Sequence, residues 1–278
     1  MPELPEVETV KQALKSQLLG REIKDVVVYE RKMVKTHDIT DFRNLLIGQK
    51  INDLTRRGKY LIFELDDYYL LSHLRMEGKF FYEDDTGIRD AHIHVEFLLE
   101  NDMKLKYEDV RKFGTFHLYP KDVDLNLTPT LAVIGPEPWA DEFNVDYVMN
   151  FLKNSTRPIK STLLVQKFVA GLGNIYADEV LFSSKINPVK KSGNLTREEA
   201  ENVVHYTREI LNKAITHRGT TIRTFSSGHQ ATGGFQNFLQ VHTKAGVACP
   251  RCQTQIIKTK VGGRGTYYCP TCQPESEA

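Results

Sequence analysis

The sequence predicts an α+β protein of two domains, in which an N-terminal helix and a β-sandwich precede a helical domain that ends in a zinc-binding hairpin. Three observations carry this prediction. Short strand-like runs fill much of the first half of the chain, helical periodicity dominates the second half, and all four cysteines lie near the carboxyl end. A chain of 278 residues is long enough for two hydrophobic cores.

The chain begins Met1-Pro2-Glu3, and a helix is expected directly after these residues. Pro5 suits a first helical turn, acidic residues accompany it, and apolar residues recur at helical spacing at Val7, Val10, Ala13, Leu14 and Leu18. An ordinary amphipathic helix explains this pattern. A catalytic amine is the alternative, because removal of Met1 would leave Pro2 with a secondary α-amine. The pKa of an α-amino group is about 7.7–8.0, so a nucleophilic fraction exists near neutral pH.

A series of short strands follows the helix. The expected strands are residues 26–29, 60–65, 69–74, 79–82, 93–99, 104–107 and 115–119, with Gly, Asp and Asn between them. Within 93–99 the apolar residues alternate and face one side. This spacing is typical of a β-sandwich rather than a parallel sheet.

Prolines and glycine at 128–143 interrupt regular structure, so a linker is expected there. Helices are predicted at 145–153, 160–169, 175–184 and 196–217. Thr196 and Glu199 form a capping box ahead of the last of these. The predicted domains are 1–130, a linker at 131–143, a helical domain at 144–224, a loop and connection at 225–240, and a zinc module at 241–278.

The four cysteines predict a metal site. Cys249-x-x-Cys252 and Cys269-x-x-Cys272 have the spacing of two knuckles that present four thiolates to one Zn²⁺. Two disulfides are the alternative, which a reducing compartment disfavours. A site of four cysteines has no open coordination position, so the zinc is expected to be structural.

Composition indicates neither a membrane protein nor an obvious polyanion binder. No apolar run approaches the length of a membrane span, and we expect a cytoplasmic protein. The net charge is only +1. A phosphate-binding face would therefore require local clustering of basic residues, and most such clusters are solvated surfaces.

Two further segments could contact a nucleic acid. The glycines of Gly171-Leu172-Gly173-Asn174 precede a helix whose N-terminus would attract phosphate, although a plain turn between helices explains them equally well. Arg111 and Phe113 stand at a turn between strands, and with Met76 they offer side chains suited to wedging into stacked bases. Met76 and Phe113 could instead be core residues, and Lys59 a surface lysine.

Four separated motifs together resemble bacterial formamidopyrimidine-DNA glycosylases. In chain order they are Pro2 to Thr9, Arg57 to Leu61, Gly171 to Tyr176, and Gly263 to Thr266 beside the zinc cysteines. The resemblance extends from the first residue to the last cysteine. It implies a helix-two-turn-helix unit in the helical domain, and a bifunctional glycosylase and abasic-site lyase that excises 8-oxoguanine and formamidopyrimidines, with β,δ-elimination.

The resemblance also implies roles for individual residues. The catalytic residues would be Pro2 as the nucleophile, Glu3 as its acid-base partner, Lys59 as an aid to excision and β-elimination, and Arg264, which would bind the lesion phosphates and aid δ-elimination. The DNA contacts would be Met76, His92, Arg111, Phe113, Lys160 and Asn174. Glu6, Glu77 and Tyr176 would line the lesion pocket, and 225–240 would include a lesion-capping loop. Val165 departs from the family, which commonly has an acid there.

The implied partner is double-stranded DNA with an oxidised purine opposite cytosine. A monomer with no membrane partner, associated with the nucleoid, is expected to bind it. Two alternatives remain open. An endonuclease VIII-like enzyme for oxidised pyrimidines is disfavoured by Leu4 and by the Arg111-x-Phe113 pair. A noncatalytic zinc-containing DNA-binding protein would retain the hairpin and the helical turn.

Overall fold

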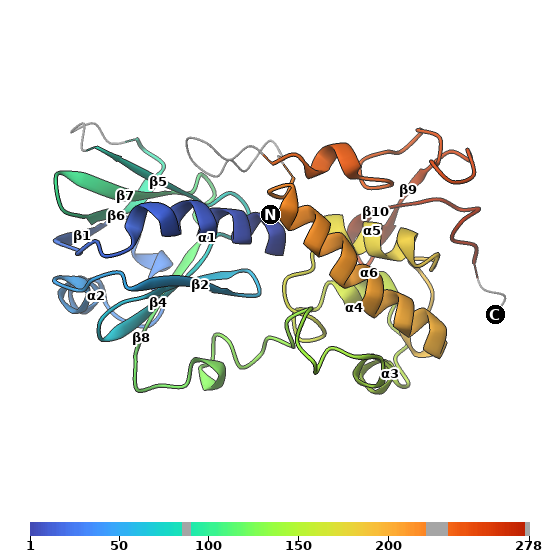
Figure 1. Ribbon diagram of the computed structural model, residues 1–278, viewed down its shortest axis with the longest axis horizontal. Helices are drawn as coiled ribbons and strands as arrows, with labels where there is room; N and C mark the ends of the chain where they lie inside the picture. The colour runs from blue at the N-terminus through green and yellow to red at the C-terminus, as the bar shows by residue number, and fades with distance from the viewer. Residues whose placement is uncertain (85–89, 221–232, 276–278) are drawn as a thin grey trace. The chain divides into compact units, whose positions relative to one another are not determined.

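The computed structural model describes residues 1–84, 90–220 and 233–275, and the chain divides into two compact units (Figure 1). The first unit comprises Met1–Ala132 with His217–Gly234, and the second comprises Val133–Thr216 with Phe235–Ala278. The expected limit of the helical domain at residue 224 differs from this division. Thr220 is hydrogen-bonded to Glu6 of the N-terminal helix, which draws the segment after residue 216 into the first unit.

The first helix forms where the sequence predicts it. Helix α1 (Leu4–Leu18) begins after Glu3, and a reciprocal capping box joins Glu3 and Glu6. The Glu3 main-chain N–H donates to Glu6 Oε2 at 2.9 Å, which satisfies a donor that the helix itself leaves unused. One face of α1 is buried in the core through Leu4, Val7, Val10, Leu14 and Leu18.

The first unit is a sandwich of two antiparallel four-stranded sheets. One sheet has the order β1 (Asp25–Val28), β6 (Ile93–Leu98), β7 (Met103–Glu108) and β5 (Lys79–Asp84). The other has the order β2 (Asp53–Arg57), β3 (Tyr60–Glu64), β4 (Tyr68–His73) and β8 (Thr115–Pro120). The β-sandwich prediction is confirmed.

Aromatic side chains join the two sheets. Phe80 of one sheet meets Phe63 and Phe116 of the other, with ring centroids 5.7 and 6.2 Å apart. Tyr107 of β7 packs edge-on against Phe116 at 4.9 Å. These edge-to-face contacts fill the space between the sheets.

One α-helix and one strand of this unit were not predicted. Helix α2 (Ile39–Leu46) has only eight residues and begins at Asp38, whose side chain accepts the Asp41 main-chain N–H. In strand β2 only Leu54 is buried, so its sequence lacks the clear alternation that identifies a half-buried strand. A short 3₁₀ helix, η1 (Arg31–Met33), precedes α2.

The second unit contains α3 (Val145–Leu152), α4 (Ile159–Leu163), α5 (Asn174–Ser183) and α6 (Arg197–Thr216). The helix predicted at 160–169 is wrong in extent, because α4 ends at Leu163 and the chain continues in turns. Phe168 and Val169 are nevertheless fully buried, and apolar residues buried in a turn mimic helical spacing. The capping box of α6 is confirmed, since Glu199 N donates to Thr196 Oγ1 and Thr196 N to Glu199 Oε2.

Three 3₁₀ helices complete the described connections: η2 (Leu125–Leu127), η3 (Ser192–Asn194) and η5 (Phe235–Phe238). The chain then forms a hairpin of β9 (Ile257–Val261) and β10 (Arg264–Tyr268). Gly262 and Gly263 make its two-residue turn with φ of 56° and 77°, left-handed values that favour glycine in tight hairpins. Arg264 follows the turn directly.

Candidate functional site

The amino terminus lies among the charged residues that the sequence singled out. Pro2 is buried, Glu3 is 2% exposed and Lys59 is 4% exposed. Lys59 occupies the two-residue turn between β2 and β3, after Gly58 with its φ of 56°. The structure thus brings Pro2, Glu3 and Lys59 together in the first unit.

The electrostatics of this terminus favour a neutral amine. Burial lowers the pKa of the Met1 ammonium, and the nearby Lys59 charge lowers it further, while Glu3, Glu6 and Glu77 act in the opposite direction with a smaller net effect. Desolvation disfavours the charged form of an amine. An amine at this position therefore has a larger nucleophilic fraction than an exposed one at the same pH.

Glu6 accepts hydrogen bonds from two main-chain segments that are far apart in sequence, one at Glu3 and one at Thr220. Its Oε2 accepts the Glu3 N–H at 2.9 Å, while Oε1 accepts the Thr220 N–H at 2.8 Å and the Thr220 hydroxyl at 3.1 Å. A Cβ at Gly219 would lie 2.6 Å from Oε1. The carboxylate thus holds the segment before residues 221–232, a role that its expected place in a lesion pocket did not suggest.

Asp109 shapes the turn that carries Arg111 and Phe113, although no sequence pattern had singled it out. Its fully buried carboxylate accepts main-chain N–H groups from Arg111 at 3.0 Å, Phe113 at 2.9 Å and Gly114 at 2.7 Å. The Arg111 guanidinium lies 4.8 Å from the Phe113 ring centroid. Phe113 is 51% exposed, so it is not a core residue.

Two other predicted DNA contacts lie near this turn. The His92 carbonyl accepts the Asp109 N–H at 3.0 Å, and the His92 side chain is exposed. Met76 is half-buried in the turn between β4 and β5. Gly78 after Met76 and Gly114 after Phe113 both approach the Tyr107 side chain, so the two turns are neighbours.

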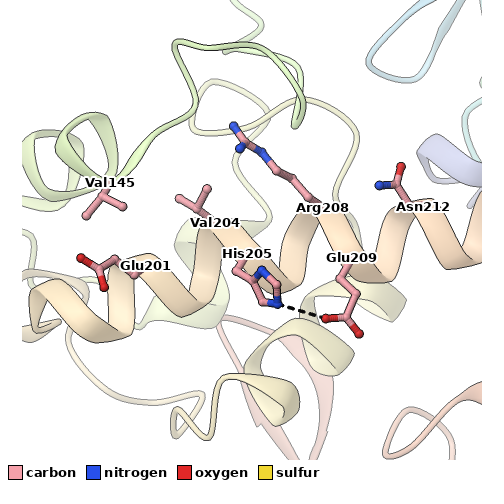
Figure 2. A pocket seen from close by; sticks show the side chains of 7 residues that line it. All are labelled: Val145, Glu201, Val204, His205, Arg208, Glu209 and Asn212. Carbon is pink, nitrogen blue, oxygen red and sulfur yellow. Dashed lines mark ion pairs between the residues drawn. The ribbon is translucent and has the colours of Figure 1, made fainter.

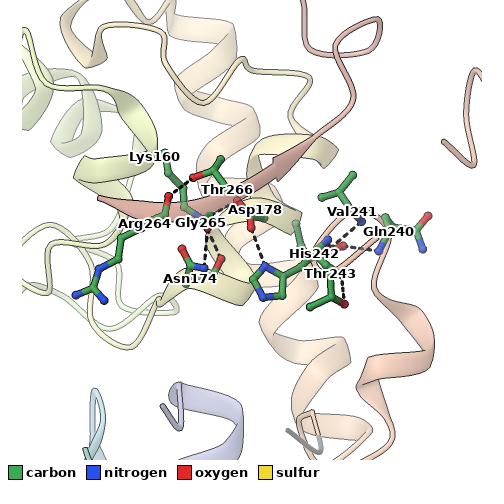
Figure 3. A network of polar contacts seen from close by, with 11 residues as sticks. Lys160, Asn174, Asp178, Gln240, Val241, His242, Thr243, Arg264, Gly265 and Thr266 are labelled. Carbon is green, nitrogen blue, oxygen red and sulfur yellow. Dashed lines mark hydrogen bonds and ion pairs between the residues drawn. The ribbon is translucent and has the colours of Figure 1, made fainter. Parts of the chain in front are cut away.

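In the second unit, Asn174 joins the start of α5 to the zinc hairpin. Its Nδ2 donates to the Gly265 carbonyl of β10 at 2.9 Å (Figure 3). Arg264, adjacent to Gly265, is exposed, and Figure 3 shows its side chain extending away from this network. Exposed guanidinium groups and helix N-termini are both groups that bind phosphates in proteins.

Lys160 does not lie at the surface. Its ammonium and the Asp178 carboxylate are both fully buried, 2.6 Å apart, and Nζ also donates to the Asn174 carbonyl at 2.9 Å. A contact between Lys160 and a DNA phosphate is incompatible with this burial. Lys160 instead fixes the Asn174 main chain, because a buried ammonium requires a charged and hydrogen-bonded partner.

Asp178 and Glu179 connect this site to the segment before the zinc module. Asp178 Oδ2 lies 2.7 Å from His242 Nδ1. Glu179 accepts main-chain N–H groups from Gln240, Val241 and His242 at 2.8–3.0 Å. Burial raises the pKa of Glu179 despite these hydrogen bonds.

The Gly171 turn is held by a neutral amide rather than an acid. Gln166 Oε1 accepts the Gly171 N–H at 3.0 Å, and its Nε2 donates to the Leu172 carbonyl at 2.8 Å. Val165 leaves the turn intact, because the amide next to it in sequence supplies both a donor and an acceptor. Tyr176 is fully buried against Phe235, 5.7 Å between centroids, and this packing does not support a lesion contact by its side chain.

The cysteines converge on one point. The four Sγ atoms lie within 4.8 Å of one another, with 3.8 Å between Cys249 and Cys272 and 3.4 Å between Cys252 and Cys269. Zn–S bonds of about 2.3 Å in a tetrahedron place sulfurs about 3.8 Å apart. Arg251 N and Cys272 N donate to Cys249 and Cys269 sulfurs, as expected of thiolate ligands.

A pocket of about 390 Å³ on α3 and α6 lies apart from these groups (Figure 2). It is lined by Val145, Glu201, Val204, His205, Arg208, Glu209 and Asn212. His205 and Glu209 form a 3.2 Å pair with both side chains more than half exposed. None of the predicted site residues lines it, and its groups are those of a solvated helix face.

Of the predicted capping loop and connection at 225–240, residues 225–232 lie outside the described residues. Within the described ranges, no helix has both the length and the apolar character needed to cross a membrane.

Three family models match successive parts of the chain. The formamidopyrimidine-DNA glycosylase N-terminal domain matches residues 1–116, the H2TH domain of the same glycosylase matches 134–226, and a zinc finger found in FPG and IleRS matches 248–274. The zinc-finger match and the cysteine geometry together identify a structural site for one zinc ion.

Whole-length relatives agree with these matches. Formamidopyrimidine-DNA glycosylases of Bacillus cereus and Streptococcus pneumoniae are both 46% identical to the chain, covering 99% and 98% of it and 99% of each relative. A Lactococcus lactis FPG variant, solved with DNA containing Fapy-dG, superposes with a TM-score of 0.92 at 43% identity over 99% of this chain and 100% of that one. MutM, solved with DNA containing carbocyclic 8-oxo-G, gives 0.90 at 42% identity over 99% and 100%.

Cys249→Ser should release the zinc and unfold the hairpin while the β-sandwich stays folded. The expected reason is that Cys249 and Cys269 belong to a small core with Phe182, Val241 and Ile256, which shares no residue with the sandwich core. Metal analysis should show loss of the one bound zinc. Hydrogen exchange should show lost protection in β9 and β10 only; equal loss in β3 and β4 would contradict this independence.

Asp178→Ala should destabilise the second unit by about 3–5 kcal/mol, because it leaves a buried ammonium without its carboxylate. Denaturant unfolding followed by the fluorescence of Trp139, the only tryptophan, measures this change. The double variant Lys160→Met, Asp178→Leu removes both charges and should recover most of the loss. Equal stability of the single and double variants would show that the charge pair is not the cause.

Proposed function

Since the chain belongs to the formamidopyrimidine-DNA glycosylase family, whose members are DNA glycosylases and abasic-site lyases, we propose that it excises oxidised purines from duplex DNA through a Schiff base at Pro2. The observation that supports this mechanism most directly is the amino terminus beside Glu3 and Lys59, where Pro2, Glu3 and Lys59 are all buried. Removal of Met1 is a condition, because the nitrogen of Pro2 is otherwise part of an amide.

The proposed reaction begins with attack of the Pro2 nitrogen on C1′ of the damaged nucleotide. The bond between C1′ and the base breaks, the base leaves with a proton, and opening of the sugar ring gives a cationic iminium. Glu3 is proposed to exchange protons with the sugar, and Lys59 to assist base release. The iminium acidifies the C2′ hydrogen; its removal expels the 3′ phosphate, and a second elimination expels the 5′ phosphate.

The surroundings of the terminus suit this chemistry. Pro2 is buried, and burial would favour the neutral form of its amine before attack. After attack the nitrogen carries a positive charge, and the carboxylates of Glu3, Glu6 and Glu77, which raise the pKa of the Met1 ammonium one residue away, are proposed to stabilise it. The site therefore supplies both a nucleophile and a counter-charge for the iminium.

An enzyme that reacts at C1′ must take the nucleotide out of the duplex. Met76, Arg111 and Phe113 are proposed to fill the vacated space, with Arg111 facing the orphaned cytosine. The Asp109 hydrogen bonds hold Arg111 and Phe113 in a fixed turn, which favours selection of the opposite base. Asn174 and the exposed Arg264 are proposed to bind phosphates. Lys160 is proposed to hold the Asn174 main chain in place through its hydrogen bond to the Asn174 carbonyl.

The oligomeric state, the location and the lesion preference of the protein are also proposed. We expect it to act as a monomer in the cytoplasm, on lesions opposite cytosine. Preference for oxidised pyrimidines would indicate the endonuclease VIII-like alternative, and DNA binding without a covalent intermediate would indicate a noncatalytic protein.

Borohydride trapping on a duplex containing 8-oxoguanine tests the Schiff base. Protein that lacks Met1, verified by intact mass, should give a covalent adduct, and Pro2→Gly should keep DNA affinity but lose trapping by about tenfold or more, since the positioned secondary amine is gone. Glu22→Gln, a surface change far along the chain from the terminus, is the matched control. Undiminished trapping by Pro2→Gly would place the nucleophile elsewhere.

Arg111→Ala should weaken discrimination by the opposite base. A well-placed arginine contributes about 1–3 kcal/mol against the wrong base, so the ratio of excision rates opposite cytosine and adenine should fall by about fivefold or more. Lys112→Ala changes the neighbouring exposed cation and should leave the ratio unaltered. An unaltered ratio in Arg111→Ala would refute its proposed role.

A further inference from the structure

The hydroxyl group of Tyr107 is buried without a hydrogen-bond partner among the described residues. Tyr107 is 0% exposed, and its ring packs on Phe80 and Phe116 at 5.0 and 4.9 Å between centroids. Burial raises the pKa of this phenol well above its ordinary value, so the group remains a neutral hydroxyl. Phenylalanine would give the same ring contacts without the cost of an unsatisfied polar atom.

The hydroxyl lies between two glycines. A Cβ at Gly78 would overlap the Tyr107 hydroxyl oxygen and lie 2.8 Å from Cζ, and a Cβ at Gly114 would overlap the same oxygen and lie 2.6 Å from Cζ. The backbones of both glycines therefore rest directly against the end of this side chain. A contact this close leaves no space for any side chain at either position.

Each glycine ends a turn that carries a proposed DNA contact. Gly78 N donates to the Leu74 carbonyl at 3.0 Å and closes the turn that contains Met76. Gly114 N donates to Asp109 at 2.7 Å and closes the turn that contains Arg111 and Phe113. The Tyr107 oxygen is thus the spacer between these two turns, and its removal would leave a gap between them that the turns could move to fill.

We propose that Tyr107 is a positioning residue that sets opposite-base discrimination by fixing the distance between the Met76 turn and the Arg111–Phe113 turn. This inference rests on the proposed function, because it requires that Arg111 reads the opposite base. Tyr107 itself does not touch DNA. It acts through the two glycine backbones, in contrast to Asp109, which fixes only one of the turns.

Tyr107→Phe tests the inference, with single-turnover excision of 8-oxoguanine opposite cytosine and opposite adenine as the readout. The cytosine-to-adenine ratio should fall by about twofold to thirtyfold, the range by which residues remote from a ligand modulate a site. Borohydride trapping opposite cytosine and the thermal midpoint should not fall, since the variant loses no hydrogen bond. An unchanged ratio overturns the inference.

A core variant separates positioning from general weakening of the sandwich. Phe97→Leu alters the same core without touching either glycine, and it should lower stability with no change in the ratio. If Phe97→Leu lowers the ratio as much as Tyr107→Phe does, the effect is not specific to the spacer, and the inference is overturned.

A double-mutant cycle with Arg111→Ala tests the route. Because Tyr107 acts through Arg111, its effect on the ratio should disappear in the Arg111→Ala background, and additive effects overturn this route. Failure of the proposed function gives a different result. If Arg111→Ala alone leaves the cytosine-to-adenine ratio unchanged, Arg111 does not read the opposite base. Any effect of Tyr107→Phe on the ratio would then not pass through Arg111, and this result also overturns the inference.

Discussion

A carboxylate buried in a protein must have its oxygens hydrogen-bonded, and three carboxylates that meet this requirement fix the functional segments of this chain. Glu6 accepts main-chain N–H groups from Glu3 and Thr220. Asp109 accepts three in the turn of Arg111 and Phe113. Glu179 accepts three from the segment that leads to the zinc module. In each case these bonds come from main-chain N–H groups, so they fix the path of the chain directly.

This constraint explains how exposed residues can be well placed. Arg111, Phe113 and Arg264 are exposed, and exposed side chains on loops are ordinarily mobile. The main chain at these positions, however, is held: the buried Asp109 accepts the Arg111 and Phe113 N–H groups, and the half-buried Asn174 donates to the carbonyl of Gly265, the residue after Arg264. The turns therefore present their side chains at defined positions before any ligand is bound, which lowers the entropy cost of binding.

The features that the sequence predicted correctly are those with local signals. The α1 helix, the capping box of Thr196 and Glu199, the sandwich strands and the cysteine knuckles all depend on residues within a few positions of one another. The contacts that it did not predict join distant positions: Glu6 with Thr220, and Asp178 with His242. No periodicity relates such residues. The helix at 160–169 was predicted too long for the same reason, since the burial of Phe168 depends on tertiary contacts rather than on a helix.

The burial of Lys160 changes the electrostatic interpretation of the second unit. The resemblance implies that this lysine binds a phosphate, but its charge is neutralised by Asp178 inside the unit. Lys160 therefore adds little to the electrostatic potential at the protein surface. The groups in this unit that are still proposed to bind a phosphate are the Asn174 turn at the N-terminus of α5 and the guanidinium of Arg264. A helix N-terminus is favourable to an anion without a net charge. Under the proposed function, a protein whose net charge is only +1 would bind a polyanion through oriented N–H groups and a few exposed cations, while the remaining charges balance one another.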